Sequence, residues 1–117
     1  MAEAALCTVW GTPVPGREKQ ALGVYNDVVK YWARLQEEGK IERFDVVVLA
    51  PVGDVTGFLL VRGGAEQIDS IRRTKEYQQL LQRVQLIVSE VRVADAFVDE
   101  GLAQIMSQYQ EVVEQAG

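Results

Sequence analysis

Five charged side chains lie among apolar residues in the β-rich parts of this sequence, and they are the groups best suited to chemistry. They are Arg43, Asp45, Arg62, Glu90 and Arg92. In a partly buried setting, Asp45 or Glu90 would act as a general base. Arg62 or Arg92 would then hold an anionic substrate. A structural network of ion pairs is the simpler interpretation, because an isolated buried ion costs several kcal/mol. The residues alone leave both interpretations open.

A second set of side chains with chemical potential is aromatic or amide in type. Large rings are stabilised chiefly by burial, so core packing is the first expectation for them. A pocket beside the core is the alternative, and there the rings would contact a bound ligand. The residues are Trp10, Tyr25, Asn26, Tyr31, Trp32 and Tyr77.

The chain has 117 residues and no histidine, which removes several kinds of catalytic site. Serine and cysteine triads, histidine-ligated haem and nearly all zinc sites depend on an imidazole. Cys7 is the only cysteine, and a small buried hydrophobe is its expected role because no histidine can activate it. EF-hand spacing and phosphate-binding glycine loops are missing from the sequence as well. We therefore expect no metal and no cofactor.

Charge and hydropathy limit the partners of the chain. The formal net charge is −5, and an acidic chain binds nucleic acid poorly because phosphate contacts need clustered Lys and Arg. The N-terminus lacks the basic and apolar regions of a signal peptide, and no apolar run approaches the ~18–20 residues that span a bilayer. We expect a cytoplasmic protein whose partners are copies of itself and a small organic ligand, with no nucleic acid and no membrane.

An alternation of strand and helix patterns positions these residues in one domain, 1–117. Pro13 and Pro15 end the first strand, and apolar residues at three- and four-residue steps predict a long helix after them. The order β-α-β-β-α-β predicts an α+β, ferredoxin-like fold over about residues 4–98, with a four-stranded antiparallel sheet and two helices on one face. The expected strands are 4–12, 41–50, 55–62 and 86–98, and the expected helices are 17–38, 65–84 with a break near Arg73-Thr74, and an extra C-terminal helix at 99–115.

Strand alternation separates the two faces of the predicted sheet. The face toward the helices is expected to carry Cys7, Val9, Phe44, Val46, Val48, Leu59, Val61, Val91 and Val93. The other face is expected to carry the five charges together with Leu6, Thr8, Trp10, Val47, Leu49, Phe58, Leu60 and Val88. That second face is too apolar to meet water, and the long final strand leaves an edge unpaired. We therefore expect a homodimer or a higher oligomer, with folding back of the C-terminal helix as the alternative.

Three features of the sequence carry a family resemblance. They are the segment Thr12-Pro13-Val14-Pro15-Gly16, Gly39 before the second strand, and Thr74-Lys75-Glu76-Tyr77 leading through Leu80-Leu81. Over about residues 4–98 the chain resembles the dimeric α+β barrel superfamily, and small bacterial members in particular. The resemblance implies two ferredoxin-like domains with their sheets face to face. The superfamily includes cofactor-free monooxygenases, lactone isomerases, polyketide cyclases and haem proteins. Its cofactor-free oxygenases use Trp, Asn and Tyr side chains around an aromatic substrate.

Three hypotheses of function follow. The first is an enzyme without metal or haem, an oxygenase or isomerase acting on an aromatic or polyketide-like compound, with Asp45 or Glu90 as its base. The second is a non-catalytic ligand-binding or accessory dimer. The third is a structural or interaction protein whose own side chains fill its pocket. A cavity that holds a carboxylate of raised pKa would favour the enzyme, and a cavity without one would favour binding. The residues expected at the pocket or the dimer face are Trp10, Tyr25, Trp32, Arg43, Phe58, Arg62, Tyr77 and Arg92.

Overall fold

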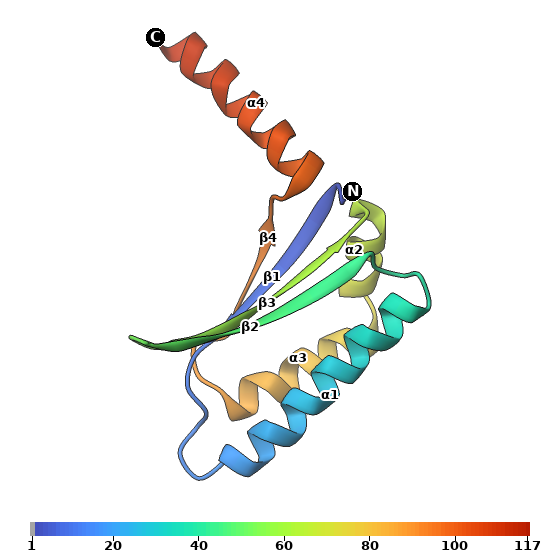
Figure 1. Cartoon of the computed structure of the whole chain (residues 1–117), viewed down its shortest axis with the longest axis vertical. Coiled ribbons are helices and arrows are strands. Elements are labelled where there is room, and N and C mark those ends of the chain that lie inside the picture. The colour runs from blue at the N-terminus through green and yellow to red at the C-terminus, as the bar shows by residue number, and fades with distance from the viewer. Residues whose placement is uncertain (1) are drawn as a thin grey trace.

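A computed structural model describes residues 2–117, without the side chains of Pro51 and Val52, and shows an α+β fold in two layers. The four strands form one antiparallel sheet in the order β2-β3-β1-β4. Three helices cover one face of this sheet, and the fourth leaves the domain at the end of β4 (Figure 1). The elements are β1 (Ala4–Trp10), α1 (Glu18–Glu37), β2 (Arg43–Val52), β3 (Val55–Gly63), α2 (Ala65–Arg72), α3 (Lys75–Ile87), β4 (Arg92–Ala96) and α4 (Asp99–Ala116). The order βαββαβ with an added C-terminal helix is the ferredoxin-like order that the sequence predicts.

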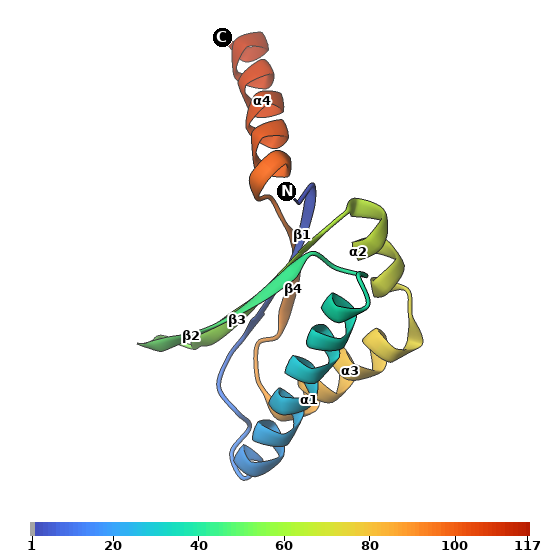
Figure 2. The same cartoon turned by 45° about the vertical axis from the view of Figure 1, so that its right-hand side comes forward.

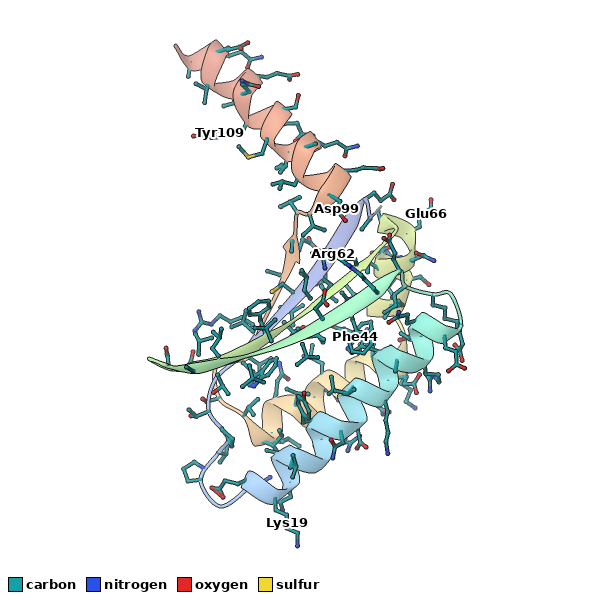
Figure 3. The ribbon with its side chains drawn as sticks, in the orientation of Figure 1. Lys19, Phe44, Arg62, Glu66, Asp99 and Tyr109 are labelled. Atoms are coloured by element: carbon teal, nitrogen blue, oxygen red, sulfur yellow. The ribbon has the colours of Figure 1, made fainter. Side chains whose placement is uncertain are left out.

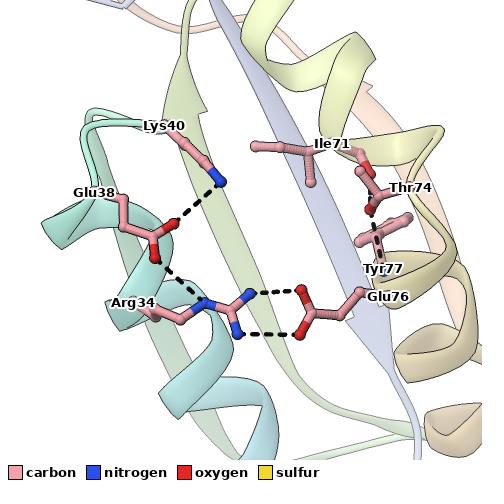
Figure 4. Close-up of polar contacts among 7 residues, drawn as sticks. All are labelled: Arg34, Glu38, Lys40, Ile71, Thr74, Glu76 and Tyr77. Carbon is pink, nitrogen blue, oxygen red and sulfur yellow. Dashed lines mark hydrogen bonds and ion pairs between the residues drawn. The ribbon is translucent and has the colours of Figure 1, made fainter.

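The predicted break in the second helical stretch is real, and Thr74 causes it. Its hydroxyl donates to the carbonyl of Ile71 at 2.7 Å and accepts the backbone N–H of Tyr77 at 3.2 Å (Figure 4). Thr74 thereby ends the turn after α2 and caps the N-terminus of α3, where free N–H groups need an acceptor.

The predicted final strand, 86–98, is too long. Helix α3 continues to Ile87, and β4 has only five residues. The apolar run around residue 87 suits a buried strand or a buried helix end equally well, and here Ile87 packs against Ala21 and Val24 of α1. Glu90 then adopts a positive φ of 54°, which interrupts any continuous strand.

The predicted faces are right for β3 and for β2 as far as Val48, and wrong by one residue for β1. Leu6 lies opposite Val61 and Thr8 lies opposite Leu59, so even-numbered residues of β1 face the helices. Cys7 and Val9 therefore belong to the other face. Both sets of alternate residues in β1 contain apolar side chains, so alternation alone could not choose between them. Trp10 is one of these even-numbered residues and therefore faces the helices, although it was expected on the other face. Val88 was expected there too, and it is buried beside α1.

The core lies between the sheet and helices α1, α2 and α3. Trp32 is its largest member, with edge-on contacts to the rings of Tyr31 at 4.9 Å and Tyr77 at 6.0 Å between centroids. On the surface above them, Arg34 of α1 forms a two-bond ion pair with Glu76 of α3, at 2.5 and 3.1 Å (Figure 4). This pair and the aromatic cluster fix α1 against α3.

Helix α4 projects from the domain on the side of the sheet that the other helices leave open (Figures 1 and 2). The chain as a whole measures 53 × 36 × 23 Å. Among residues 2–117, no helix has the length and apolar character needed to cross a membrane. The sheet face away from α1, α2 and α3 is called the outer face below, and its apolar residues are Cys7, Val9, Val47, Phe58 and Leu60.

Candidate functional site

A cavity of about 490 Å³ opens between α1, the end of α3 and the end of the sheet next to the β2–β3 hairpin. Its wall is almost wholly apolar. The aromatic core cluster around Trp32 fills one end of the domain, whereas the cavity lies at the other end, where its lining includes small and aliphatic side chains such as Ala21 and Val84. The main apolar residues of the lining are Trp10, Leu22, Val24, Tyr25, Val28, Val46, Val48, Leu59, Val84 and Ile87.

Trp10 forms part of the floor of this cavity, and Gly57 makes room for its ring. The two residues lie opposite each other in the β1–β3 ladder. A Cβ atom on residue 57 would lie 2.9 Å from Cζ2 of Trp10 and 2.5 Å from the carbonyl oxygen of Val47. Only glycine therefore allows the indole to rest against the backbone of β3 at this point.

The polar groups in the described lining are few. They are the hydroxyls of Thr8 and Thr56, the phenol of Tyr25, the indole N–H of Trp10 and the carboxylate of Glu18. The backbone N–H of Gly16 donates to Glu18 at 2.8 Å, and backbone hydrogen bonds hold the pKa of this carboxyl below its ordinary value. Glu18 is therefore ionised and already engaged at neutral pH, which suits it poorly to abstract a proton.

The five charged residues do not reach this cavity. Arg62 is buried to a large degree on the outer face, where its Nη1 donates to Asp45 at 2.8 Å and its Nε lies 3.8 Å from Asp99. Arg92 lies 3.8 Å from Glu90 in the turn before β4. Arg43 lies opposite Arg62 in the β2–β3 ladder, is exposed, and has no ion-pair partner among the described residues. The structure thus pairs four of the five charges, Arg62 with Asp45 and Arg92 with Glu90, outside the cavity.

The aromatic residues divide between the cavity and the core. Trp10 and Tyr25 line the cavity together, and Tyr25 is 39% exposed at its mouth. Trp32 and Tyr77 are buried in the core, and Phe58 lies on the outer face. The Tyr77 hydroxyl has no hydrogen-bond partner among the described residues, and burial raises the pKa of Tyr77.

Several cavity residues were missed from the sequence. Leu22 and Val48 are each 63% exposed and stand at the mouth of the cavity, and Thr56 lies in the wall. The sequence does contain a sign that Leu22 borders the cavity. It lies one turn before Tyr25 and beside the buried stripe of α1, so it widens the apolar face of that helix. Val48 follows the alternation of β2 and gave no sign that it bordered a cavity.

Comparisons with known proteins identify the fold. No family model and no curated protein matches the chain. Among solved structures, a dimeric protein of unknown function and ferredoxin-like fold from Bacteroides fragilis is similar, with a TM-score of 0.58, 11% identity, and coverage of 80% of this chain and 95% of that one. SnoaB, a cofactor-independent oxygenase from Streptomyces nogalater, has a TM-score of 0.60, 8% identity, and coverage of 85% and 95%.

A conserved protein from Methanosarcina mazei is similar as well, with a TM-score of 0.61, 11% identity, and coverage of 81% and 92%. At these identities the likeness establishes the fold and nothing finer. The chain has a ferredoxin-like α+β fold, as the sequence features predict.

Proposed function

We propose that this protein binds an apolar small molecule, aromatic or polyketide-like in type, in the cavity between α1, α3 and the sheet, and that it does so as a homodimer. The observation that carries the proposal is the cavity itself. Its volume of about 490 Å³ falls within the usual range for small-molecule sites, which is roughly 300–1,000 Å³. Its wall offers apolar contact over almost its whole area and only a few polar groups to orient a ligand.

The indole of Trp10 favours a ligand with a flat ring. It is held against the backbone of β3 at Gly57, so it presents a rigid surface on which another ring can stack. The hydroxyls of Thr8 and Thr56 can donate to or accept from an oxygen on such a ligand. A strongly charged ligand is disfavoured, because no arginine or lysine is among the described lining residues.

Binding is favoured over catalysis because the described lining holds no group poised as a base. Its one carboxylate, Glu18, has a lowered pKa, whereas a general base near neutrality needs a raised one. Asp45 and Glu90, the candidate bases in the sequence, are exposed and paired with arginines outside the cavity.

A cofactor-free oxygenase is the second candidate. The placement of Trp10 beside Tyr25 at the cavity is the observation in its favour, since these residue types suit an aromatic substrate. SnoaB, which has the same fold, is a cofactor-independent oxygenase. In such an enzyme the substrate itself would have to ionise readily, because the cavity supplies little help with proton removal. Oxygen consumption with dihydroxyanthracene-type substrates would distinguish this function from binding.

The outer face supports the homodimer. Its five apolar side chains are half-buried, none of helices α1, α2 and α3 covers them, and contiguous apolar surface of this kind usually marks an interaction site. The ion pair between Arg62 and Asp45 lies beside these apolar side chains. A second copy that covers this face would bury both.

Thermal shift measurements with hydroxyanthraquinones, flavones and aromatic lactones test the binding function. A ligand at 100 times its dissociation constant stabilises the native state by about 2.7 kcal/mol, which raises the Tm of a domain this size by about 10 °C. Leu22→Glu places a charge at the mouth of the cavity and is expected to reduce that shift. Gln20→Glu makes the same charge change on the same helix away from the lining, and its shift should match that of the wild type. If no compound in the panel raises Tm, the proposed function is wrong.

A further inference from the structure

Helix α4 carries an apolar stripe that no other part of residues 2–117 covers. Four of its members, Leu102, Met106, Tyr109 and Val112, are between 47% and 62% exposed, and Ile105 and Val113 complete the stripe. The helix points away from the domain in two views (Figures 1 and 2), and Tyr109 projects from the edge of α4 that overlooks the open side of the sheet (Figure 3).

The base of α4 is fixed to the sheet. The Asp99 carboxylate lies 3.8 Å from Nε of Arg62 and accepts the backbone N–H of Ala2 at 3.4 Å. Gly101 is buried against the chain at Glu3, and a Cβ atom there would lie 2.6 Å from the Glu3 carbonyl oxygen. Packing at these three points therefore sets the direction in which α4 leaves the domain.

The chain exposes more surface than a compact monomer of its mass. Its accessible surface is 7667 Å², whereas a folded monomer of 13.0 kDa exposes about 6,300 Å². Its radius of gyration is 16.1 Å, against about 13 Å for a compact domain of this length. The surplus of about 1,300 Å² per copy would amount to about 2,600 Å² in a dimer, which is the size of an obligate homodimer interface.

The charge of α4 argues against a membrane surface as its partner. The helix carries Asp99, Glu100, Glu111 and Glu114 and no lysine or arginine. Helices that lie on membrane surfaces typically carry Lys and Arg on their polar face, so this helix suits an anionic bilayer poorly. The outer face of the chain, in contrast, is an apolar surface bordered by charges of both signs, with Arg43 and Arg92 beside Asp45 and Glu90. A second copy thus offers an apolar surface to the stripe.

We propose that α4 is an arm exchanged between two copies of this chain. Its apolar stripe packs on the second copy beside the face-to-face contact of the sheets, and the acidic residues of its distal half, Glu111 and Glu114, stay on the solvent side of the helix. The proposal rests on the homodimer put forward above and goes beyond it, because it assigns a separate contact surface to α4. It does not involve the cavity, so ligand binding and arm exchange can fail independently.

Photo-crosslinking on the full chain tests whether the contact is between chains. Benzoylphenylalanine at position 109 is expected to give a covalent dimer on a denaturing gel. The same group at position 107, on the polar side of α4, is the matched control and should give none. Crosslinks from position 109 that lie only within one chain would show that α4 folds back, and the absence of any crosslink would show that the stripe is free. Either result overturns the proposal.

Sedimentation equilibrium measures how much the apolar stripe of α4 contributes to the stability of the dimer. Met106→Lys with Tyr109→Lys is expected to raise the dimer dissociation constant at least about tenfold, since two apolar side chains lose their buried surface. Gln104→Lys with Ser107→Lys makes the same charge change on the polar side and should leave the constant within about twofold of the wild type. Circular dichroism and the ligand-induced thermal shift should be unchanged in both variants. Equal constants for the two double variants, or binding of the wild type to phosphatidylcholine–phosphatidylglycerol vesicles through α4, would overturn the proposal.

Discussion

Replacing Gly57 by alanine tests the contact that forms the floor of the cavity. The new methyl group would lie 2.5 Å from the Val47 carbonyl oxygen and 2.9 Å from Cζ2 of Trp10. The Val47 carbonyl is part of the backbone of a paired strand and cannot move without disturbing β2. The loss of stability should therefore lie at the upper end of the range for overpacked cores. We expect Gly57→Ala to lower the free energy of unfolding by about 3 kcal/mol. The Tm should fall by about 10 °C.

Gly23→Ala is the matched control for this change. Gly23 lies in α1, and a Cβ atom there would have no atom within 4 Å. Because alanine favours a helix over glycine by about 1 kcal/mol, this variant should be more stable than the wild type. Urea unfolding followed by circular dichroism, at one fixed protein concentration, gives both values. If the two variants change stability in the same direction, the close contact of Trp10 with β3 is wrong.

Three further changes probe other parts of the structure. Phe58→Asp places a charge on the outer face and should dissociate the dimer at micromolar concentration, as sedimentation velocity would show; unchanged assembly would mean that the outer face is not the interface. Tyr77→Phe removes a buried hydroxyl that has no partner among the described residues, so urea unfolding should show equal or greater stability, by up to about 1 kcal/mol. A clear loss would show that the hydroxyl is hydrogen-bonded. The Arg34 guanidinium lowers the pKa of Glu76, so this pair stabilises the protein above the ordinary carboxyl pKa, and its contribution is lost as the pH falls. Because the pair is exposed, Glu76→Gln should cost only about 0.5 kcal/mol at pH 7, and the difference from the wild type should shrink by pH 3.

Much of the fold could be predicted because local signals agree with the tertiary structure. Helix α1 has a single buried stripe, and Thr74 is a strong N-cap residue at the break between α2 and α3. The hairpin between β2 and β3 is marked by its turn residues. The end of α3 is harder to predict, because the apolar run around Ile87 is compatible with both a buried strand and a buried helix. Only the contact with α1 favours the helix.

The candidate site was predicted only in part, because a cavity is a property of packing. The sequence identifies Trp10 and Tyr25 as suitable side chains, but it cannot show that small residues such as Ala21 leave space beside them. The register of β1 was misjudged because both of its faces are apolar, and this placed Trp10 on the wrong side of the sheet. The charges around Arg62 suggest a site on the outer face, but there Arg62 is paired with Asp45 and lies near Asp99, away from the cavity.

The indole N–H signals of the two tryptophans provide the most direct test of the ligand-binding cavity. Trp10 lines the cavity and Trp32 is buried in the core, so a bound ligand should affect them differently. In ¹⁵N-labelled protein, assigned with Trp10→Phe, titration with a hydroxyanthraquinone should shift the Trp10 signal to saturation at one ligand per chain and leave the Trp32 signal almost unchanged. A saturable shift of Trp32 with none at Trp10, or no saturable shift with any compound of the panel, would contradict the proposed site.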